Sequence, residues 1–294
     1  MYPGKFGCGD PQDLKYERGA NLERISDIYE CARQEGKREV MVSWLRSKPR
    51  HPPALEDILK GYDTVGGTED FYSGFIVPER IVGTYDSGRS VCFSPSFRPL
   101  PRQGCGDFAS KWMRVYRDVN RWLDSGNKIE LFEFMHDLYI SEGNKRVSVA
   151  RYLNMPEVNV RVKRIIPSLS NNLPEVDDYH EYLDFERRTG LKWIRFSPGK
   201  DYKKIEGAID ELYGENPKKY DRFMKEVFVP FLHSYMRASK HAPVDRIGDV
   251  FIDFLEDVQY PVEMKEDERE KVIRKKLKSR KKSRKTHTDV AGTT

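Results

Sequence analysis

The chain is poor in cysteine and has no long apolar segment, and each absence excludes a class of protein. Its 294 residues include four cysteines, which stand far apart with no Cys-x-x-Cys pair and no neighbouring histidine at metal-ligand spacing. We therefore expect free thiols and no zinc centre. No apolar run approaches the ~20 residues that span a bilayer, and residues 1–13 lack the charged-then-apolar order of a signal peptide. These absences predict a cytoplasmic protein without a membrane partner.

Positive charge is concentrated near the end of the chain. The net charge is +5, and residues 271–285 alone hold ten Lys or Arg and no acid, so the remainder carries about −5. A basic patch that binds DNA is therefore expected only in this tail. A solvated, disordered end would have the same composition and is an equal alternative. The predicted nucleic-acid contacts are Lys275, Lys276, Lys278, Arg280, Lys281, Lys282, Arg284 and Lys285.

The hydrophobic pattern favours an α+β fold with helical regions on both sides. Helical spacing of apolar residues predicts a helix over 14–36 that ends at Gly36, followed by helices over 38–47 and 54–60. A strand is expected within 70–82, and a loop rich in Gly, Ser, Pro and Arg follows over 83–106. A loop of that length in a compact domain is usually functional or mobile.

The next block alternates between helical and strand patterns within a short stretch. The expected order is a helix over 108–124, strands over 128–135 and 138–142 joined by a turn at His136 and Asp137, a helix over 144–153 and a strand over 158–167. A helix ending at Thr189-Gly190, a short strand over 191–197 and helices from 198 onward, over 218–238 and over 245–257, complete the pattern. We divide the chain into a helical N-terminal extension, an α+β domain, a helical region and a basic tail that frays into disorder: 1–65, 66–205, 206–264 and 265–294.

The turn at Gly143 is the strongest local signal of a binding site. A strand ends in Glu142, a glycine follows, and a helix begins with Lys145 and Arg146 in its first turn. Cations are unfavourable at the start of a helix, where unpaired N–H groups and the helix dipole already favour an anion. A phosphate or carboxylate at this site would account for them, with Ser148 as a further donor. The alternative is a turn whose cations pair with Glu142 and Asp137.

Residues 81–167 resemble the ParB/sulfiredoxin-like superfamily. The run SEGNKRVSVARYL resembles its Gly-x-x-Arg signature, and a later segment from Tyr179 to Tyr202 resembles one found in poorly characterised bacterial domains with the EGNKRVSV motif. The resemblance implies a small mixed sheet with packed helices and a site for CTP or ATP with Mg²⁺, built from Gly143, Asn144, Lys145 and Arg146. Asn144 stands where sulfiredoxins carry their catalytic cysteine, so sulfinic-acid reduction is not expected.

Further candidates are single residues outside this turn. Arg89, in the loop before the long helix, is a candidate phosphate clamp, against the alternative of an exposed loop arginine. Glu142 and Glu79 are weak candidates for a general base, Glu142 also for holding Mg²⁺ through water, and His136 is expected to serve only the turn.

Three functions follow from the resemblance and these candidates. The first is a nucleotide-binding protein with a regulatory or DNA-associated role. The second is a phosphotransferase similar to the free-serine kinase of this fold, and the third is a non-catalytic interaction module. The resemblance also allows a homodimer.

Overall fold

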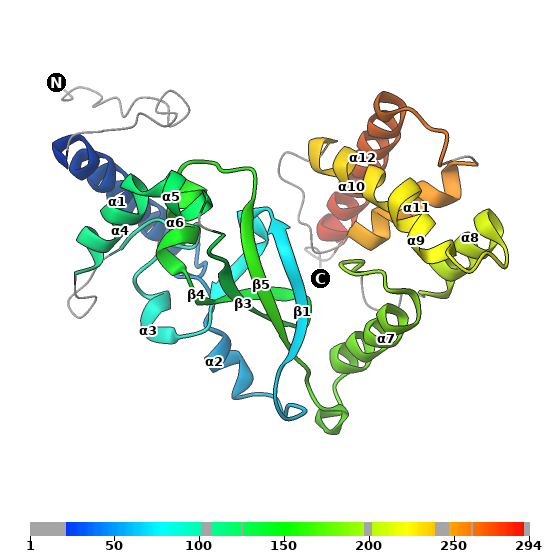
Figure 1. Ribbon diagram of the computed structural model, residues 1–294, viewed down its shortest axis with the longest axis horizontal. Helices are drawn as coiled ribbons and strands as arrows, with labels where there is room; N and C mark the ends of the chain where they lie inside the picture. The colour runs from blue at the N-terminus through cyan, green and yellow to red at the C-terminus, as the bar shows by residue number, and fades with distance from the viewer. Residues whose placement is uncertain are drawn as a thin grey trace. The chain divides into compact units, whose positions relative to one another are not determined.

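The computed structural model describes residues 22–100, 107–124, 126–196, 202–238, 247–259 and 261–290 (Figure 1). The chain divides into two compact units, residues 1–171 and 172–294. The first unit contains the whole sheet, and all the regular elements among the described residues of the second unit are helices. The predicted boundaries at 65, 205 and 264 stay predictions.

The sheet of the first unit is mixed and has five strands, in the order β1-β5-β3-β4-β2. The pairs β1/β5 and β3/β4 are antiparallel, and β3/β5 and β2/β4 are parallel. The prediction of an α+β fold with a mixed sheet is therefore confirmed. The strands are β1 (Glu69–Ile76), β2 (Ile81–Thr84), β3 (Ile129–Phe134), β4 (Asp137–Glu142) and β5 (Val158–Ile165).

A two-residue turn joins β3 to β4. Met135 and His136 have φ angles of 48° and 73°, the pair of left-handed conformations that suits a tight hairpin. The predicted hairpin is confirmed, with its turn one residue earlier than expected. Glu133 accepts a hydrogen bond from the His136 amide (2.5 Å) and also forms a buried ion pair with Arg164 on β5 (2.6 Å). His136 thus serves the turn, and the turn is tied to the centre of the sheet.

Helices and short turns surround the sheet in the first unit. One long helix, α1, replaces the two helices predicted before residue 47, so the expected break at Gly36 is wrong. Instead, a Cβ at Gly36 would lie only 3.0 Å from the Arg98 Cβ, so the glycine permits a close approach to the 93–100 segment. The predicted helix over 108–124 is broken at Asp118 into α4 and α5. These elements are α1 (Leu22–Leu45), α2 (Leu55–Leu59), η1 (Pro78–Arg80), α3 (Ser87–Ser90), α4 (Phe108–Arg117), α5 (Val119–Asp124), α6 (Asn144–Tyr152) and η2 (Leu169–Asn171).

The glycine-rich and proline-rich stretch after residue 83 is packed as far as residue 100. It begins in β2, passes through α3, and buries Phe93, Phe97 and Leu100. The expectation of a structureless loop is therefore wrong for this part, and residues 101–106 lie outside the described residues. Because α1 packs against α4, and α4 against α6, the buried aromatic side chains have a helical layer to pack on (Figure 1).

The second unit is a set of helices around aromatic side chains. No strand forms over the described residues 191–196, so that predicted strand is wrong, and residues 197–201 lie outside the described residues. The predicted stop at Thr189-Gly190 is confirmed, since Gly190 adopts a left-handed φ of 71° after α7. The elements of the second unit are α7 (Pro174–Thr189), α8 (Lys203–Tyr213), α9 (Lys219–Phe223), the π-helix η3 (Met224–Phe228), α10 (Val229–Ala238), α11 (Ile247–Asp257) and α12 (Glu266–Val290).

The helix expected at the start of the basic tail is present. It is α12, which packs against α10 and α11. Ile273 is completely buried, and Lys276 forms an ion pair of 2.6 Å with Asp257. The first half of α12 is thereby anchored to its own unit.

The cysteines also differ from expectation. Cys31 and Cys92 are both disulfide-bonded. The prediction of free thiols is therefore wrong for these two, and the cysteines no longer favour a reducing compartment. Cys8 and Cys105 lie outside the described residues.

Among the helices that the structure describes, none is long and apolar enough to cross a membrane.

Candidate functional site

The Gly143 turn has the strand–glycine–helix geometry that the sequence predicts. β4 ends at Glu142, and Gly143 caps α6 with φ 103° and ψ 20°, a left-handed conformation that favours glycine. A Cβ here would also lie 3.2 Å from the Ile129 side chain and from the Arg146 guanidinium. The first intrahelical bond runs from the Val147 amide to the Gly143 carbonyl. The amides of residues 144–146 therefore stand at the positive end of the helix without an intrahelical acceptor.

A cavity of about 320 Å³ lies at this turn. It brings together five of the six residues predicted to bind phosphate, together with the candidate base Glu142, and adds residues that the sequence did not single out. The predicted phosphate residues are Arg89, Gly143, Asn144, Lys145 and Arg146, and the additional ones include Phe108 and Lys111.

Arg89 reaches this cavity because α3 is fixed at both sides. Asp86 caps α3 by accepting a hydrogen bond from the Arg89 amide (2.9 Å). Glu56 of α2 accepts hydrogen bonds from both the amide (2.7 Å) and the hydroxyl of Ser87. These contacts hold the pKa of the Glu56 carboxyl below its usual range, which keeps the carboxylate charged as an acceptor. A short helix in a surface segment is thereby held in one position.

The cavity carries positive charge that the protein does not neutralise. Among the described residues, Arg89 and Lys145 form no ion pair, whereas Lys111 is paired with Asp107 at 3.0 Å. The Lys145 ammonium lies 4.7 Å from the centre of the Phe108 ring. Burial first, and then the nearby Arg89 and Lys111, lower the pKa of Lys145 from its ordinary value. The folded chain therefore places a partly desolvated ammonium beside two further cations.

Arg146 has a different environment. Its Nη1 donates to the carbonyl oxygens of Asn127 (3.3 Å) and Lys128 (3.1 Å), and its Nη2 lies 3.6 Å from a Glu142 oxygen. The side chain is only 15% exposed, and burial lowers its pKa. The alternative in which a cation of the turn pairs with Glu142 thus holds for Arg146 and not for Lys145. Arg146 fastens the turn to the segment before β3.

Asn144 and Ser148 are the two uncharged side chains predicted at the site. The Asn144 Oδ1 atom is buried and has no hydrogen-bond partner. Ser148 is fully buried and does not line the cavity. Its hydroxyl donates to the Phe97 carbonyl (2.6 Å) and accepts from Trp112 Nε1 (2.9 Å). Its donor is therefore used inside the protein, and Asn144 is the polar side chain that remains for a ligand.

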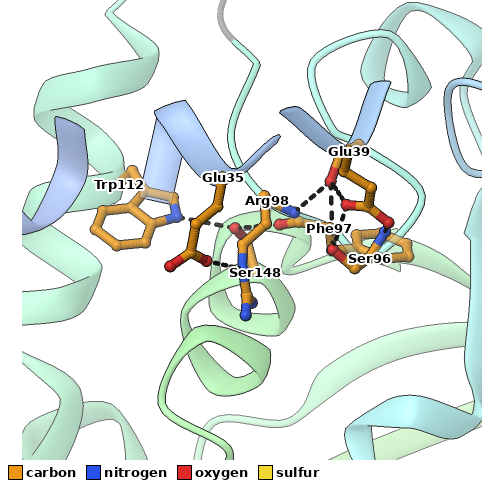
Figure 2. A network of polar contacts seen from close by, with 8 residues as sticks. Glu35, Glu39, Ser96, Phe97, Arg98, Trp112 and Ser148 are labelled. Atoms are coloured by element: carbon orange, nitrogen blue, oxygen red, sulfur yellow. Dashed lines mark hydrogen bonds and ion pairs between the residues drawn. The ribbon is translucent and has the colours of Figure 1, made fainter. Parts of the chain in front are cut away.

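The contacts of Ser148 belong to a network of hydrogen bonds and ion pairs that connects α6 to the 94–98 segment and to α1 (Figure 2). Glu39 of α1 accepts hydrogen bonds from the Ser96 amide (3.0 Å) and hydroxyl (2.5 Å), and Glu35 pairs with Arg98 at 2.8 Å. The 94–98 segment is thus bound to α1 on one side and, through the Phe97 carbonyl and Ser148, to α6 on the other. This network holds α6, whose first residues line the cavity, in place.

Glu79 does not lie at the cavity. It belongs to η1, beside the partly buried Arg151, which donates to the Pro78 (3.0 Å) and Ile81 (2.5 Å) carbonyls. Burial lowers the pKa of Arg151 to about 10, and the Glu79 charge opposes this shift. Of the two carboxylates considered as bases, only Glu142 lines the cavity, with 77% of its side chain exposed.

The predicted nucleic-acid contacts lie on α12 of the second unit. Lys275 and Lys278 are exposed, whereas Lys276 is paired with Asp257. Lys271 is also exposed, so residues 271, 275 and 278 follow one another along one helix face. The side chains of Arg280, Lys281, Lys282, Arg284 and Lys285 lie outside the described residues.

Sequence reasoning missed Lys111 and Phe108 as parts of the site. Both lie on α4, and no local pattern in the sequence links them to the turn: the spacing of Asp107 and Lys111 predicts only an ion pair on a helix. The described residues hold no cluster of three or more His, Cys, Asp or Glu that could bind a metal ion. Comparison with known protein families, curated proteins and solved structures found no match for this chain.

Proposed function

We propose that the cavity at the Gly143 turn binds the phosphates of a nucleotide, CTP or ATP, and that this binding serves a regulatory or DNA-associated role. The observation that supports it is the pair of cations without an ion-pair partner, Arg89 and Lys145, on one cavity at the start of α6. A phosphate dianion would neutralise both and accept hydrogen bonds from the helix amides.

Each lining residue has a role that follows from its contacts. Gly143 lets the ligand approach the backbone, Asn144 and the helix amides supply polar contacts, and Lys145 supplies a charge beside the phosphates. Arg89 is a clamp that can bind two phosphate oxygens with its planar guanidinium. Arg146, whose nitrogens already serve the turn, acts mainly by positioning it.

Mg²⁺ fits this proposal as a partner of the ligand. Protein sites for Mg²⁺ with nucleotides use one or two carboxylates together with phosphate oxygens and water. Glu142 is the carboxylate that lines the cavity, and it would hold the ion through water. The ion would screen the charge of the phosphates, and the cations of the chain would bind the charge that remains.

The first experiment is a thermal-shift and calorimetric titration of the whole chain with CTP, ATP, ADP and GTP, with Mg²⁺. At a nucleotide concentration of 100 times Kd, we expect stabilisation of about 2.7 kcal/mol. Arg89→Ala should reduce affinity about tenfold or more. Lys60→Ala is the control, because Lys60 is exposed, lies in the same unit and does not line the cavity. If no nucleotide stabilises the wild-type chain, the proposal fails and the interaction-module alternative gains support.

A phosphotransferase on the same site is the second candidate. The position of Glu142 favours it, since a carboxylate at the mouth of a phosphate cavity can accept a proton from an attacking hydroxyl. Incubation with γ-labelled ATP and free serine tests it. Transfer that is lost in Glu142→Gln, with nucleotide binding retained, would support a kinase, and binding without transfer would support a regulatory role.

A role at DNA would use the basic face of α12. Its exposed lysines stand on a helix whose first half is anchored by Ile273 and by the ion pair of Lys276. Phosphate contacts from such a face give attraction that falls steeply with salt and carries no sequence preference of its own. We propose this face as the nucleic-acid contact of the second unit.

A further inference from the structure

A second hollow adjoins the cavity at the Gly143 turn, and two residues line both spaces. It has a volume of about 630 Å³, and Glu142 and Arg146 line both spaces. Its other charged walls are Lys128, Glu130 and Arg161, and Trp122 of α5 also lines it. A ligand anchored by phosphate in the first cavity therefore has space to extend past Glu142 and Arg146 into the second.

Two carboxylates face each other in this hollow. Glu130 on β3 and Glu142 on β4 are direct partners across the antiparallel pair, next to an irregularity between Glu130 and Leu131. Like charges in that position destabilise a sheet, and such irregularities are frequent near sites where they redirect a side chain. The protein thus accepts an unfavourable pairing at the edge of a cavity.

Neither carboxylate is held tightly. Glu142 lies 3.6 Å from Arg146, and Glu130 lies 3.7 Å from Arg161, both longer than a hydrogen-bonded ion pair. A carboxylate has about four acceptor positions. Each of these two therefore keeps room for a hydrogen-bond donor from a ligand.

Two of the cations of the hollow are already engaged. Lys128 Nζ donates to the Ser73 hydroxyl at 2.6 Å, and Arg146 Nη1 donates to two backbone carbonyls. Arg161 keeps donors of its own, so the second hollow offers two carboxylates as acceptors beside one guanidinium, whereas the first cavity offers mainly donors. The pair of spaces suits a ligand with phosphates at one end and hydroxyl groups at the other.

We propose that the second hollow binds the ribose and base of the nucleotide whose phosphates occupy the first cavity. This inference rests on the proposed function and specifies the ligand. The ribose hydroxyls donate to Glu130, the chemistry by which an acidic side chain binds ribose in other nucleotide sites. The indole of Trp122, oriented by a hydrogen bond from its Nε1 to the Val115 carbonyl (3.1 Å), offers a ring for the base to stack on.

Glu130→Gln provides a test in which electrostatics and direct contact have opposite effects. The substitution removes a negative charge beside the phosphate cavity, so a general charge effect would tighten the binding of every polyphosphate. We expect tripolyphosphate to bind equally or slightly more tightly, and ATP and CTP to bind about tenfold more weakly. The preference of wild type for ATP over 2′,3′-dideoxy-ATP should disappear in this variant.

Trp122→Leu tests the base contact. We expect weaker binding of ATP and CTP with tripolyphosphate unchanged, and Trp44→Leu is the control because Trp44 is exposed and lines neither space. If Trp122→Leu does not fold, the Glu130→Gln comparison alone decides.

The outcomes separate the two proposals. Tripolyphosphate binding as tight as nucleotide binding in wild type, or tighter binding of both ligands in Glu130→Gln, overturns the ribose and base site and leaves the phosphate cavity intact. No binding of either ligand to wild type overturns both proposals.

Discussion

The ammonium group of Lys145 lies 4.7 Å from the centre of the Phe108 ring, and among the described residues it has no ion-pair partner. The contact offsets part of the desolvation of the lysine, because the face of an aromatic ring attracts a cation. It does not neutralise the charge. A lysine in this position can therefore bind an anion, and it lowers the stability of the ligand-free protein.

Lys145→Met should remove anion binding and leave the ligand-free protein as stable as wild type or more so. Methionine keeps the packing against Phe108 without a buried charge. The pKa of Lys145 is lowered in the folded state, so its unfavourable contribution is present at neutral pH and is relieved as pH rises from the folded pKa toward 10.5.

Urea unfolding of both proteins between pH 7 and pH 10 measures this contribution. The stability advantage of Lys145→Met should shrink with rising pH, and wild-type anion affinity should fall over the same range. A wild type that is more stable than Lys145→Met at neutral pH without ligand would contradict this prediction.

Gly143→Ala should destabilise the fold and weaken anion binding. A non-glycine residue in a left-handed conformation costs roughly 1–2 kcal/mol, and the added Cβ would press on the Arg146 guanidinium and on Ile129. Gly67→Ala is the matched control, since Gly67 has φ 90° and open space around its Cβ position. Thermal unfolding of both variants separates the backbone cost from the crowding, and equal losses would show that crowding contributes nothing.

Ser148→Ala should cost stability and leave nucleotide affinity unchanged. The substitution leaves Trp112 Nε1 and the Phe97 carbonyl without their buried partner, at a cost of roughly 1–3 kcal/mol. Affinity is measured by calorimetry at a temperature where the variant is fully folded. A variant of normal stability with weakened phosphate binding would instead indicate that Ser148 contacts the ligand.

Replacing Lys271, Lys275 and Lys278 together by Gln should weaken DNA binding equally across sequences and make it less dependent on salt. Each lost phosphate contact reduces the slope of log K against log salt by about 0.9 for duplex DNA. Fluorescence anisotropy between 50 and 200 mM salt measures the slope. Replacement of Arg187, Lys204 and Lys225, exposed cations of the same unit, is the control. An unchanged slope in the α12 variant would exclude this face as the contact.

The local chemistry of the Gly143 turn could be predicted from the sequence because it depends on neighbours in the chain. A strand pattern, a glycine and two cations are sufficient to place a helix start with unpaired amides. The partners of the turn could not be predicted. Arg89 lines the cavity from α3, whose position depends on Glu56, and Lys111 lines it from α4.

The errors have physical causes of the same kind. Glycine usually marks a helix end, but Gly36 instead allows Arg98 and Pro99 to approach α1. The composition of the stretch after residue 83 predicts a loop, but Glu35 and Glu39 supply acceptors for its backbone and side chains. The local sequence favours Ser148 as a donor to a ligand, because its actual partner, Trp112, lies on another element. Each of these contacts joins segments far apart in the sequence.

The order of the central strands has a consequence for how the chain folds. β3, β4, α6 and β5 follow one another without interruption over residues 129–165, so their pairings close short loops, which is kinetically favourable. α3, which carries Arg89, must dock from a distant part of the chain. We therefore expect the wall of the cavity at Gly143 to form in the folding transition state and the Arg89 side to form after it, so that an anion ligand would slow unfolding and leave the folding rate almost unchanged.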